Sequence, residues 1–168
     1  AQSVLCRFSF RCTPMAYIHI LGAFYYAATR HEEALGGARA KGFLGKGVFG
    51  SKFDFDITVA RGAGAYICVE ETGLIGSVEV HRGQPRVKPP FPAVVGVFGG
   101  PTVFNNVETL ACVPLILENG ADWFKSFGPP KNTGPKLSCV SGNLKKPGVY
   151  ELTSAVNRKG LLDYHPGG

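Results

Sequence analysis

The chain lacks several features that mark whole classes of proteins. Its five cysteines stand singly, without the close pairs that metal sites require, so we expect free thiols in a reducing compartment. They are Cys6, Cys12, Cys68, Cys112 and Cys139. No apolar run approaches the roughly 20 residues that a membrane helix needs. The sequence therefore predicts no metal site and no direct membrane insertion, and we expect a soluble or peripheral protein.

Acidic residues are also scarce. The chain has 12 Asp and Glu against 18 Lys and Arg, which gives a formal net charge of +6. Such an excess suits an anionic partner, but the basic residues are scattered and no basic stripe interleaved with aromatic residues occurs. This pattern favours a basic part of a larger assembly over a nucleic-acid-binding protein. The phosphates of a dinucleotide would suit the same charge.

The length and composition favour a single core with many turns. With 168 residues, 45% of them hydrophobic, the chain can bury one core, and its 23 glycines and 12 prolines indicate short elements. Residues 1–14 contain Arg7 and Arg11 but no acid, a composition that mitochondrial targeting segments share. We favour a non-native or misread end, because Met15 directly precedes the first predicted strand. The segment is left uninterpreted.

Hydrophobic periodicity predicts a strand, a helix and a second strand in the first third of the chain. A strand covers 16–21, an extended arm 24–28, a helix 29–41 and a strand 53–60. Glu32 and Glu33 are expected in the first turn of the helix, where carboxylates favour the positive end of the dipole. Gly36 and Gly37 are expected to interrupt the helix, and Gly42 to end it. Strand, helix and strand imply a parallel pair with a right-handed crossover.

The later elements are predicted to be shorter. They are a helix over 70–78, a proline-rich loop over 81–92, a helix from 107, and strands over 136–141 and 148–152. Asn106 is the expected N-cap of the helix from 107, which Pro114 bends and Gly120 ends.

The run from Phe53 to Thr72 is the most informative part of the chain. Apolar and polar residues alternate along its strand, a glycine-rich turn follows, and Glu70 and Glu71 come soon after the turn. Small residues after a strand let a ligand approach the backbone, and a helix starting there would point free N–H groups at that ligand. The run therefore indicates a cofactor loop, although many turns of this kind bind nothing.

Three stretches follow one another in the order of a known family. They read GAGAYICVEET from Gly62, QPRVKPPFP from Gln84 and GGPTVFNNVET from Gly99. Over residues 16–152 the chain closely resembles the 51 kDa-type flavoprotein subunit that oxidises NADH in respiratory complex I. It is also similar to the diaphorase subunits of NAD-linked hydrogenases and formate dehydrogenases. The resemblance implies the FMN- and NADH-binding core of an NADH dehydrogenase, with hydride transfer from NADH to FMN.

The resemblance also implies the residues that bind the cofactors. They are Tyr66, Glu70, Glu71, Lys88, Phe91, Asn105, Asn106 and Thr109. Tyr66, Glu70 and Glu71 line a cleft shared by FMN and NADH, Phe91 stacks on the NADH base, and Lys88 meets its polar part. The carboxylate of Glu71 accepts hydrogen bonds from the ribose and repels the extra phosphate of NADPH. From the residues alone, the two glutamates could equally be helix caps, and Lys88 an ordinary exposed lysine.

Asn105, Asn106 and Thr109 resemble the family's FMN contacts at the start of a helix, where amides suit a phosphate. Simple capping by Asn106 is the alternative, and both roles are compatible. The chain departs from the family at Val69, where the family has glycine, because a β-branched residue fits poorly in a left-handed backbone or beside a flavin. No residues match the family's first glycine-rich loop or its iron–sulfur cysteine motif. We therefore expect about half of the pocket here, and a 4Fe-4S cluster only in the complete subunit.

The expected fold is α/β, a Rossmann-like, partly parallel sheet with flanking helices, plus the start of a β-grasp hairpin at the C-terminal end. The expected domains are the uninterpreted 1–14, a partial FMN/NADH-binding domain over 15–134, and the start of the β-grasp domain over 135–168. Partners implied by the family are NADH and other subunits, including a 2Fe-2S subunit of the 24 kDa type. The expected location is cytoplasmic and peripheral on the inner membrane, or the mitochondrial matrix side. The alternatives are a catalytically silent fragment and a diaphorase subunit.

Overall fold

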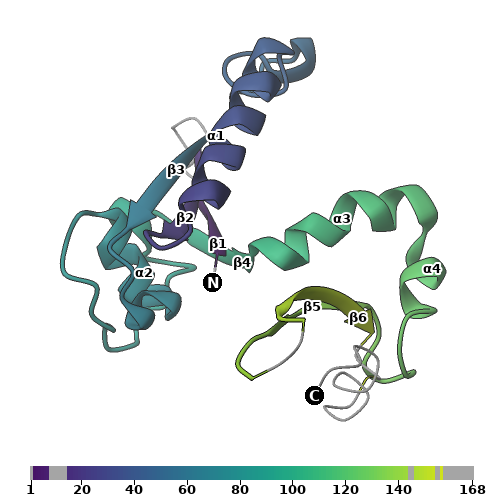
Figure 1. Ribbon diagram of the computed structural model, residues 1–168. Helices are drawn as coiled ribbons and strands as arrows, with labels where there is room; N and C mark the ends of the chain where they lie inside the picture. Colours follow the sequence, from purple (N-terminus) through teal and green to yellow (C-terminus); the bar gives the residue numbers. More distant parts are fainter. Residues whose placement is uncertain (1, 8–14, 144–145, 154–155, 157–168) are drawn as a thin grey trace. The chain divides into compact units, whose positions relative to one another are not determined.

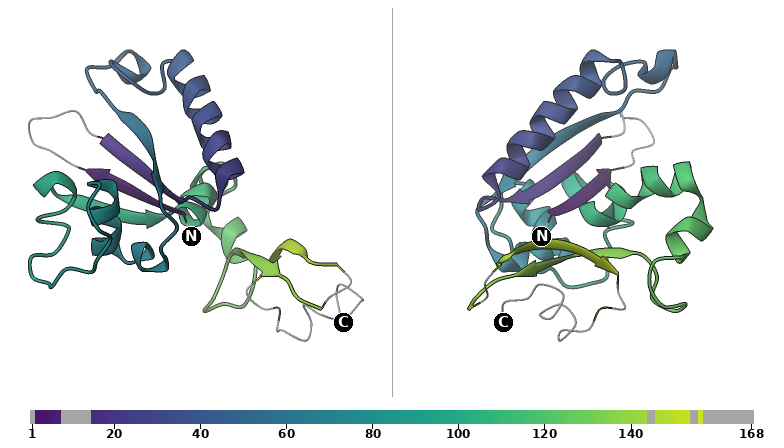
Figure 2. Two further views of the ribbon diagram at one scale, coloured as in Figure 1. Left: turned by 60° about the vertical axis from the view of Figure 1, so that its left-hand side comes forward. Right: turned by 45° about the vertical axis from the view of Figure 1, so that its right-hand side comes forward.

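The structure is a computed structural model, drawn in Figures 1 and 2, and it describes residues 2–7, 15–143, 146–153 and 156. Of residues 2–7, only the backbone is described. The chain divides into two units, Ala1–Leu110 and Ala111–Gly168, and the division falls within helix α3, Val107–Asn119. The family-based boundary at residue 134 stays a prediction, and the interpretation of residues 8–14 lies outside the described residues.

The first unit is built on a four-stranded sheet in the order β3-β2-β1-β4. Its strands are β1 (Gln2–Arg7), β2 (Met15–Leu21), β3 (Asp56–Gly62) and β4 (Thr102–Asn106). Strands β2 and β3 are parallel, with Ile18 opposite Val59, whereas β1 is antiparallel to β2 and to β4. The partly parallel sheet of the predicted α/β fold is therefore confirmed. Strands β1 and β4 were not predicted: β1 lies in the uninterpreted segment, and β4 leads directly into a helix.

Alternate residues of β2 pack into two cores on opposite faces of the sheet, as the two-residue period of a strand requires. Ile18 and Ile20 lie in one core with Ala28 of helix α1, Tyr25–Ala40. On the other face, Tyr17 packs on a cluster that includes Leu74 of helix α2, Glu71–Val78. Helices α1 and α2 (Figure 2) thus flank the sheet, and the second of them carries the predicted site.

Helix α1 begins at Tyr25 rather than at Thr29, so the extended arm predicted for residues 24–28 is wrong after Phe24. The reason is tertiary, because Ala28 is only 2% exposed and packs on the sheet, which stabilises one more helical turn. The strand beside it also shifts. Strand β3 begins at Asp56 rather than at Phe53 and extends through Gly62, which pairs with Leu21.

Two details predicted inside α1 are wrong. Glu32 and Glu33 lie well beyond the first turn, and they pair with Arg61 at 2.8 Å and with Arg30 at 3.1 Å. The glycines at 36 and 37 do not interrupt the helix, which runs to Ala40. The neighbouring Leu35 is buried, and burial of this turn outweighs the low helix propensity of glycine.

Gly42 ends α1, as predicted. Its φ is +73°, its N–H donates to the carbonyl of Arg39 at 3.0 Å, and the N–H of Phe43 donates to that of Ala38 at 2.9 Å. This pair of bonds is the Schellman arrangement, in which glycine adopts the left-handed conformation without a Cβ clash.

The side chain of His19 in β2 contacts helix α2. The side chain is buried, and its Nε2 lies 3.0 Å from the Ser77 hydroxyl. A Cβ added at Gly62 would lie 2.5 Å from that nitrogen, so glycine is required there for packing. Burial lowers the pKa of His19, which keeps the imidazole neutral at pH 7.

The second unit contains the rest of α3 and three further elements. They are α4 (Ala121–Lys125), β5 (Pro135–Val140) and β6 (Gly148–Thr153). Strands β5 and β6 form an antiparallel pair of their own, with Ser138 opposite Tyr150, so the predicted hairpin is confirmed. Pro114 lies inside α3, and Gly120, with φ +88°, separates α3 from α4.

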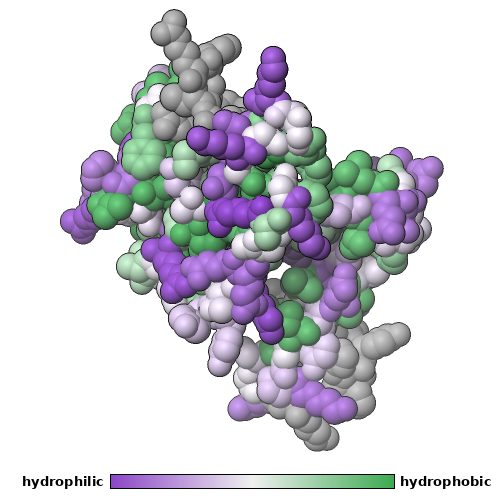
Figure 3. All heavy atoms as spheres, turned by 90° about the horizontal axis from the view of Figure 1, so that it is seen from above, coloured by the Kyte–Doolittle hydropathy of each residue, from purple (hydrophilic) through white to green (hydrophobic). Residues whose placement is uncertain are grey.

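The surface is mixed in polarity. On the face drawn in Figure 3, hydrophilic and hydrophobic side chains are interspersed. Within the described residues, no helix is long and apolar enough to cross a membrane, and no group of three or more potential metal ligands comes together.

Candidate functional site

The two adjacent glutamates lie at the start of α2. Glu70 is the N-cap, and its Oε2 accepts hydrogen bonds from the backbone N–H groups of Thr72 at 2.9 Å and Gly73 at 2.8 Å. The Thr72 hydroxyl also donates to Oε2, at 2.5 Å. The capping alternative for Glu70 is confirmed. The predicted free N–H groups are wrong for Thr72 and Gly73, because the side chain of Glu70 occupies them.

This capping also sets the charge of Glu70. Desolvation is the largest influence and raises the pKa, but the hydrogen bonds from Thr72 and Gly73, with the charge of Lys88, outweigh it and lower the pKa of Glu70 below its ordinary value. Glu70 is therefore ionised at neutral pH. A fixed carboxylate here can accept hydrogen bonds from hydroxyl or amide groups of a ligand.

Lys88 faces both glutamates from the proline-rich loop. Its ammonium donates to Oε1 of Glu71 and lies 3.7 Å from Oε1 of Glu70. The hydrogen bond to Glu71 and the charges of both carboxylates raise the pKa of Lys88, although desolvation acts in the opposite sense. The side chains of Lys88 and Glu71 are 29% and 38% exposed, so a ligand can reach this charged group. The structure thus brings together three of the predicted residues.

Glu79 binds the loop that carries Lys88, and the sequence alone did not predict a role for this residue. The carboxylate of Glu79, 9% exposed, accepts hydrogen bonds from the Arg86 guanidinium at 2.6 Å and from the backbone N–H of Phe98 at 2.7 Å. Burial alone would raise the pKa of Glu79, but these bonds and the charges of Arg86 and His81 lower it. No local sequence pattern indicates the pairing of Glu79 with Arg86, because an irregular loop brings the two residues together.

Phe91 and Tyr66 present exposed rings. Phe91 is 58% exposed and Tyr66, in the 3₁₀ turn Tyr66–Val69, is 88% exposed. The backbone around Phe91 is nevertheless fixed, because its carbonyl accepts from the N–H groups of Val94 and Val95 at 2.9 and 3.0 Å. Large exposed aromatic rings on a fixed backbone are suited to stacking on planar ligands.

Asn105, Asn106 and Thr109 lie where β4 ends and α3 begins. Asn105 and Asn106 are the last residues of β4, and Thr109 belongs to the first turn of α3. The Asn106 Oδ1 accepts from the N–H of Glu108 at 3.2 Å, which confirms Asn106 as a cap. Within the described part of the chain, no hydrogen bond or ion pair joins this group to the glutamates of α2. The two groups share a core, because Phe104 of β4 packs on the α2 cluster.

Cys68 and Val69 lie just before α2. Cys68 is buried, and a Cβ added at Gly83 would lie 2.4 Å from its sulfur, so the sulfur packs against the loop. Val69 is 40% exposed and is not among the described residues with a left-handed φ. The backbone at Val69 therefore does not require glycine, and Val69 differs from the family pattern only by the space that its side chain fills.

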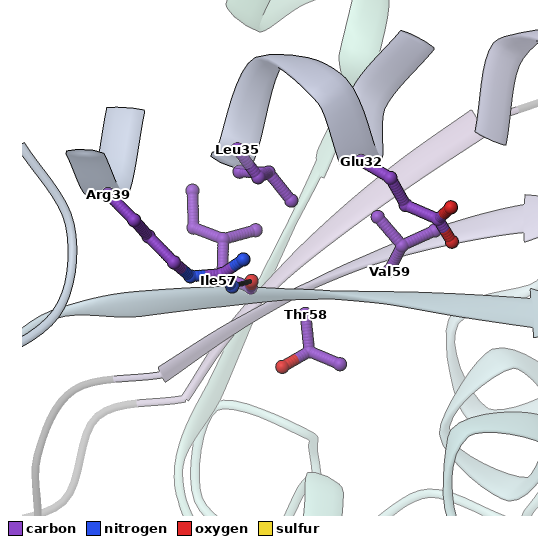
Figure 4. Close-up of a pocket in the computed structure, with 6 residues that line it drawn as sticks. All are labelled: Glu32, Leu35, Arg39, Ile57, Thr58 and Val59. Carbon is purple, nitrogen blue, oxygen red and sulfur yellow. Dashed lines mark hydrogen bonds between the residues drawn. The ribbon is translucent and has the colours of Figure 1, made fainter. Parts of the chain in front are cut away.

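A separate hollow lies between α1 and β3 (Figure 4). Leu35, Ile57 and Val59 form its apolar part, while Thr58 points to the opposite side of β3. The charged residues at its two ends are engaged: Glu32 binds Arg61 at 2.8 Å, and Arg39 binds Asp56 at 2.8 Å. Since its charges are paired within the protein, this hollow has no group aimed at a ligand.

Comparison with known proteins identifies the family. Residues 9–115 match the family model described as the Nuo51 FMN-binding domain. The chain belongs to this family. The resemblance drawn from the three motifs is therefore confirmed.

Relatives and solved structures agree with this assignment. Over 91% of its length, the chain is 51% identical to an NADH-quinone oxidoreductase subunit of Rhizobium meliloti (strain 1021), of which it covers 36%. It is 49% identical to the mitochondrial NADH dehydrogenase [ubiquinone] flavoprotein 1 of Dictyostelium discoideum, with 91% of this chain and 32% of that protein covered.

Among solved structures, the NAD+-reducing [NiFe]-hydrogenase in the air-oxidized state matches with a TM-score of 0.76 and 38% identity, covering 91% of this chain and 25% of that chain. This likeness confirms the α/β class. The chain spans about a third of the length of the curated relatives that it matches.

Proposed function

We propose that this chain supplies one wall of the FMN- and NADH-binding site of an NADH:quinone oxidoreductase flavoprotein subunit. The observation that carries the proposal is the charged group at the start of α2, where Glu70 and Glu71 meet Lys88 within the matched FMN-binding domain. Carboxylates accept hydrogen bonds from the sugar hydroxyls and the amide of a nicotinamide dinucleotide, and an ammonium suits its phosphates. The reaction is hydride transfer from NADH to FMN.

Glu71 and Lys88 would select the dinucleotide. Glu70 is engaged in capping α2, so Glu71 is the carboxylate whose oxygens are better placed to bind ribose hydroxyls. In the structure, Glu71 accepts a hydrogen bond from Lys88. Binding of NADH would replace part of this bond, and the ammonium would then meet the polar part of the ligand. Phe91, with its exposed ring and fixed backbone, would stack on the base.

The residues present fit FMN. Bound FMN accepts two electrons as a hydride and can release them singly. Gly64 has a φ of +92°, and nothing lies within 4 Å of an added Cβ, so the turn before Tyr66 leaves space for a ligand beside the backbone. The amides of Asn105 and Asn106, with the Thr109 hydroxyl, would donate to the FMN phosphate at the start of α3.

The test uses the protein encoded by the complete reading frame that contains these 168 residues. After purification, its flavin content would be measured from the absorbance spectrum, and its NADH oxidation would be followed with an artificial one-electron acceptor. Retained FMN and NADH-dependent turnover support the proposal. Absence of both would support the second candidate, a catalytically silent fragment, which Val69 and the unmatched first glycine-rich loop favour.

The 168-residue chain by itself is expected to bind FMN weakly or not at all. Its residues supply one wall of the site, and no residues match the family loop that holds the FMN phosphate. Titration of the chain with FMN, followed by flavin fluorescence, measures this affinity. Tight one-to-one binding would show that the remaining residues suffice.

The partners and the location follow from the same proposal. The hydrogenase likeness leaves a diaphorase subunit as a third candidate, but identity is higher to the quinone and ubiquinone oxidoreductase subunits, at 51% and 49%, than to the hydrogenase, at 38%. We propose assembly with other subunits of such a complex, including a 2Fe-2S subunit of the 24 kDa type. The proposed location is peripheral on the cytoplasmic side of an inner membrane, or the matrix side in mitochondria. Co-purification of the protein with the other subunits from a membrane fraction would test the proposed assembly and the proposed location.

A further inference from the structure

The loop between α2 and the 3₁₀ turn Val97–Gly99 contains two residues of the proposed site but no helix or strand. The positions of Lys88 and Phe91 therefore cannot come from the regular hydrogen bonds of secondary structure. They come instead from contacts between the loop and the elements around it. Next to Phe91, the carbonyl of Pro92 accepts a hydrogen bond from the N–H of Thr102 in β4 at 2.9 Å. On the side of Lys88, the contacts with α2 converge on Arg86, two residues before Lys88.

Arg86 is attached at two points. Its backbone N–H donates to the Thr72 hydroxyl at 2.7 Å, and this hydroxyl in turn donates to Glu70 at 2.5 Å. Its guanidinium donates to Glu79 at 2.6 Å. One set of bonds thus runs from the carboxylate of Glu70 to the loop, and the other holds the loop to the end of α2.

Glu79 is the better buried member of the pair. Its side chain is 9% exposed against 45% for Arg86, and its other oxygen accepts from the N–H of Phe98, which has a left-handed φ of +49°. His81 is the other titratable group near this carboxylate, at 3.5 Å. Since a buried carboxylate without its partner is costly, the pair should keep one geometry, and that geometry extends to Lys88.

We propose that Glu79 and Arg86 are positioning residues: their ion pair fixes the proline-rich loop so that Lys88 and Phe91 face Glu70 and Glu71, and so controls the affinity for NADH. The inference rests on the proposed function, which it deepens. The pair acts through the loop, so it should change KM for NADH while kcat and the FMN content stay nearly constant.

The test compares three single variants and the double variant of Glu79→Gln with Arg86→Met, in the protein encoded by the complete reading frame. Glu79→Gln keeps an acceptor for Phe98 but removes the charge facing Arg86. Arg86→Met removes the other partner, and Arg82→Met is the matched control, because Arg82 is an exposed arginine of the same loop. We expect KM for NADH to rise about tenfold in each of the first two, and by no more in the double variant, because both remove the same interaction. The control should equal the wild type.

Amide hydrogen exchange gives a second measurement that needs no ligand. The Arg86 N–H should exchange faster in Glu79→Gln, whereas the N–H of Leu74 in α2 should be unchanged, which shows that the protein remains folded. An effect of Arg86→Met without an effect of Glu79→Gln would mean that Arg86 contacts the ligand directly and would overturn the inference. Additive effects, or exchange at the wild-type rate, would overturn it too. If the wild type does not oxidise NADH, the proposed function fails, and exchange decides separately whether the pair orders the loop.

Discussion

Replacing Glu71 by glutamine should weaken the preference for NADH over NADPH. The side chain keeps its shape and can still bind a ribose hydroxyl, but it loses the charge that repels the additional phosphate of NADPH. The structure places Glu71 at the exposed start of α2, where a ligand can reach it.

The size of the effect follows from the surroundings of Glu71. For two unit charges about 5 Å apart, the interaction is about 0.8 kcal/mol at a dielectric constant of about 80 and about 3.3 kcal/mol at about 20. The Glu71 side chain is 38% exposed, and Lys88 already compensates part of its charge. We therefore expect a change near the lower end, about 1 kcal/mol, which is about a fivefold change in the ratio of kcat/KM values.

Steady-state kinetics with both dinucleotides measure this ratio in the wild type and in the Glu71→Gln protein. The matched control is Glu33→Gln, which removes one negative charge from the exposed face of α1, where Glu33 pairs with Arg30. Lys88→Met should have the opposite effect, because it leaves the charge of Glu71 uncompensated. If the ratio is the same in wild type and Glu71→Gln, Glu71 does not read the ribose, and its role is limited to α2 and Lys88.

Four further substitutions test the site and its support. Glu70→Ala should lower the free energy of unfolding by about 1 kcal/mol, because the N-cap of α2 is lost. The folded-state pKa of Glu70 is lowered, so this stabilisation is present above about pH 4.5 and is lost as the pH falls through the folded-state pKa. The free energies of unfolding of the wild type and the variant, measured by urea titration, should therefore converge in acid. Gly83→Ala should destabilise the protein by about 1 to 3 kcal/mol, since its Cβ would lie 2.4 Å from the Cys68 sulfur. Gly37→Ala should stabilise the protein by about 1 kcal/mol, because open space surrounds this position in α1. Melting temperatures equal to that of the wild type would contradict both predictions. Val69→Gly should raise the affinity for FMN or NADH in the complete protein by removing a side chain beside the site, and an unchanged dissociation constant would refute that reasoning.

The local sequence alone determined several parts of this protein. The alternation before the glycine-rich turn predicts β3, Asn106 is a cap, and Gly42 ends α1, because strand periodicity and helix capping depend on residues only a few positions apart. The three motifs also identify the family, and the match over residues 9–115 confirms it.

Only the tertiary structure decided the remaining features. The pairing of Lys88 with Glu71, 17 residues away, depends on the path of an irregular loop, and no local pattern encodes that path. The same holds for the pairing of Arg86 with the buried carboxylate of Glu79. The start of α1 at Tyr25 likewise depends on the burial of Ala28 against the sheet, which the helix propensity of the neighbouring residues does not reflect. In each case, contacts between separate segments outweigh the small energy differences by which neighbouring residues favour one conformation over another.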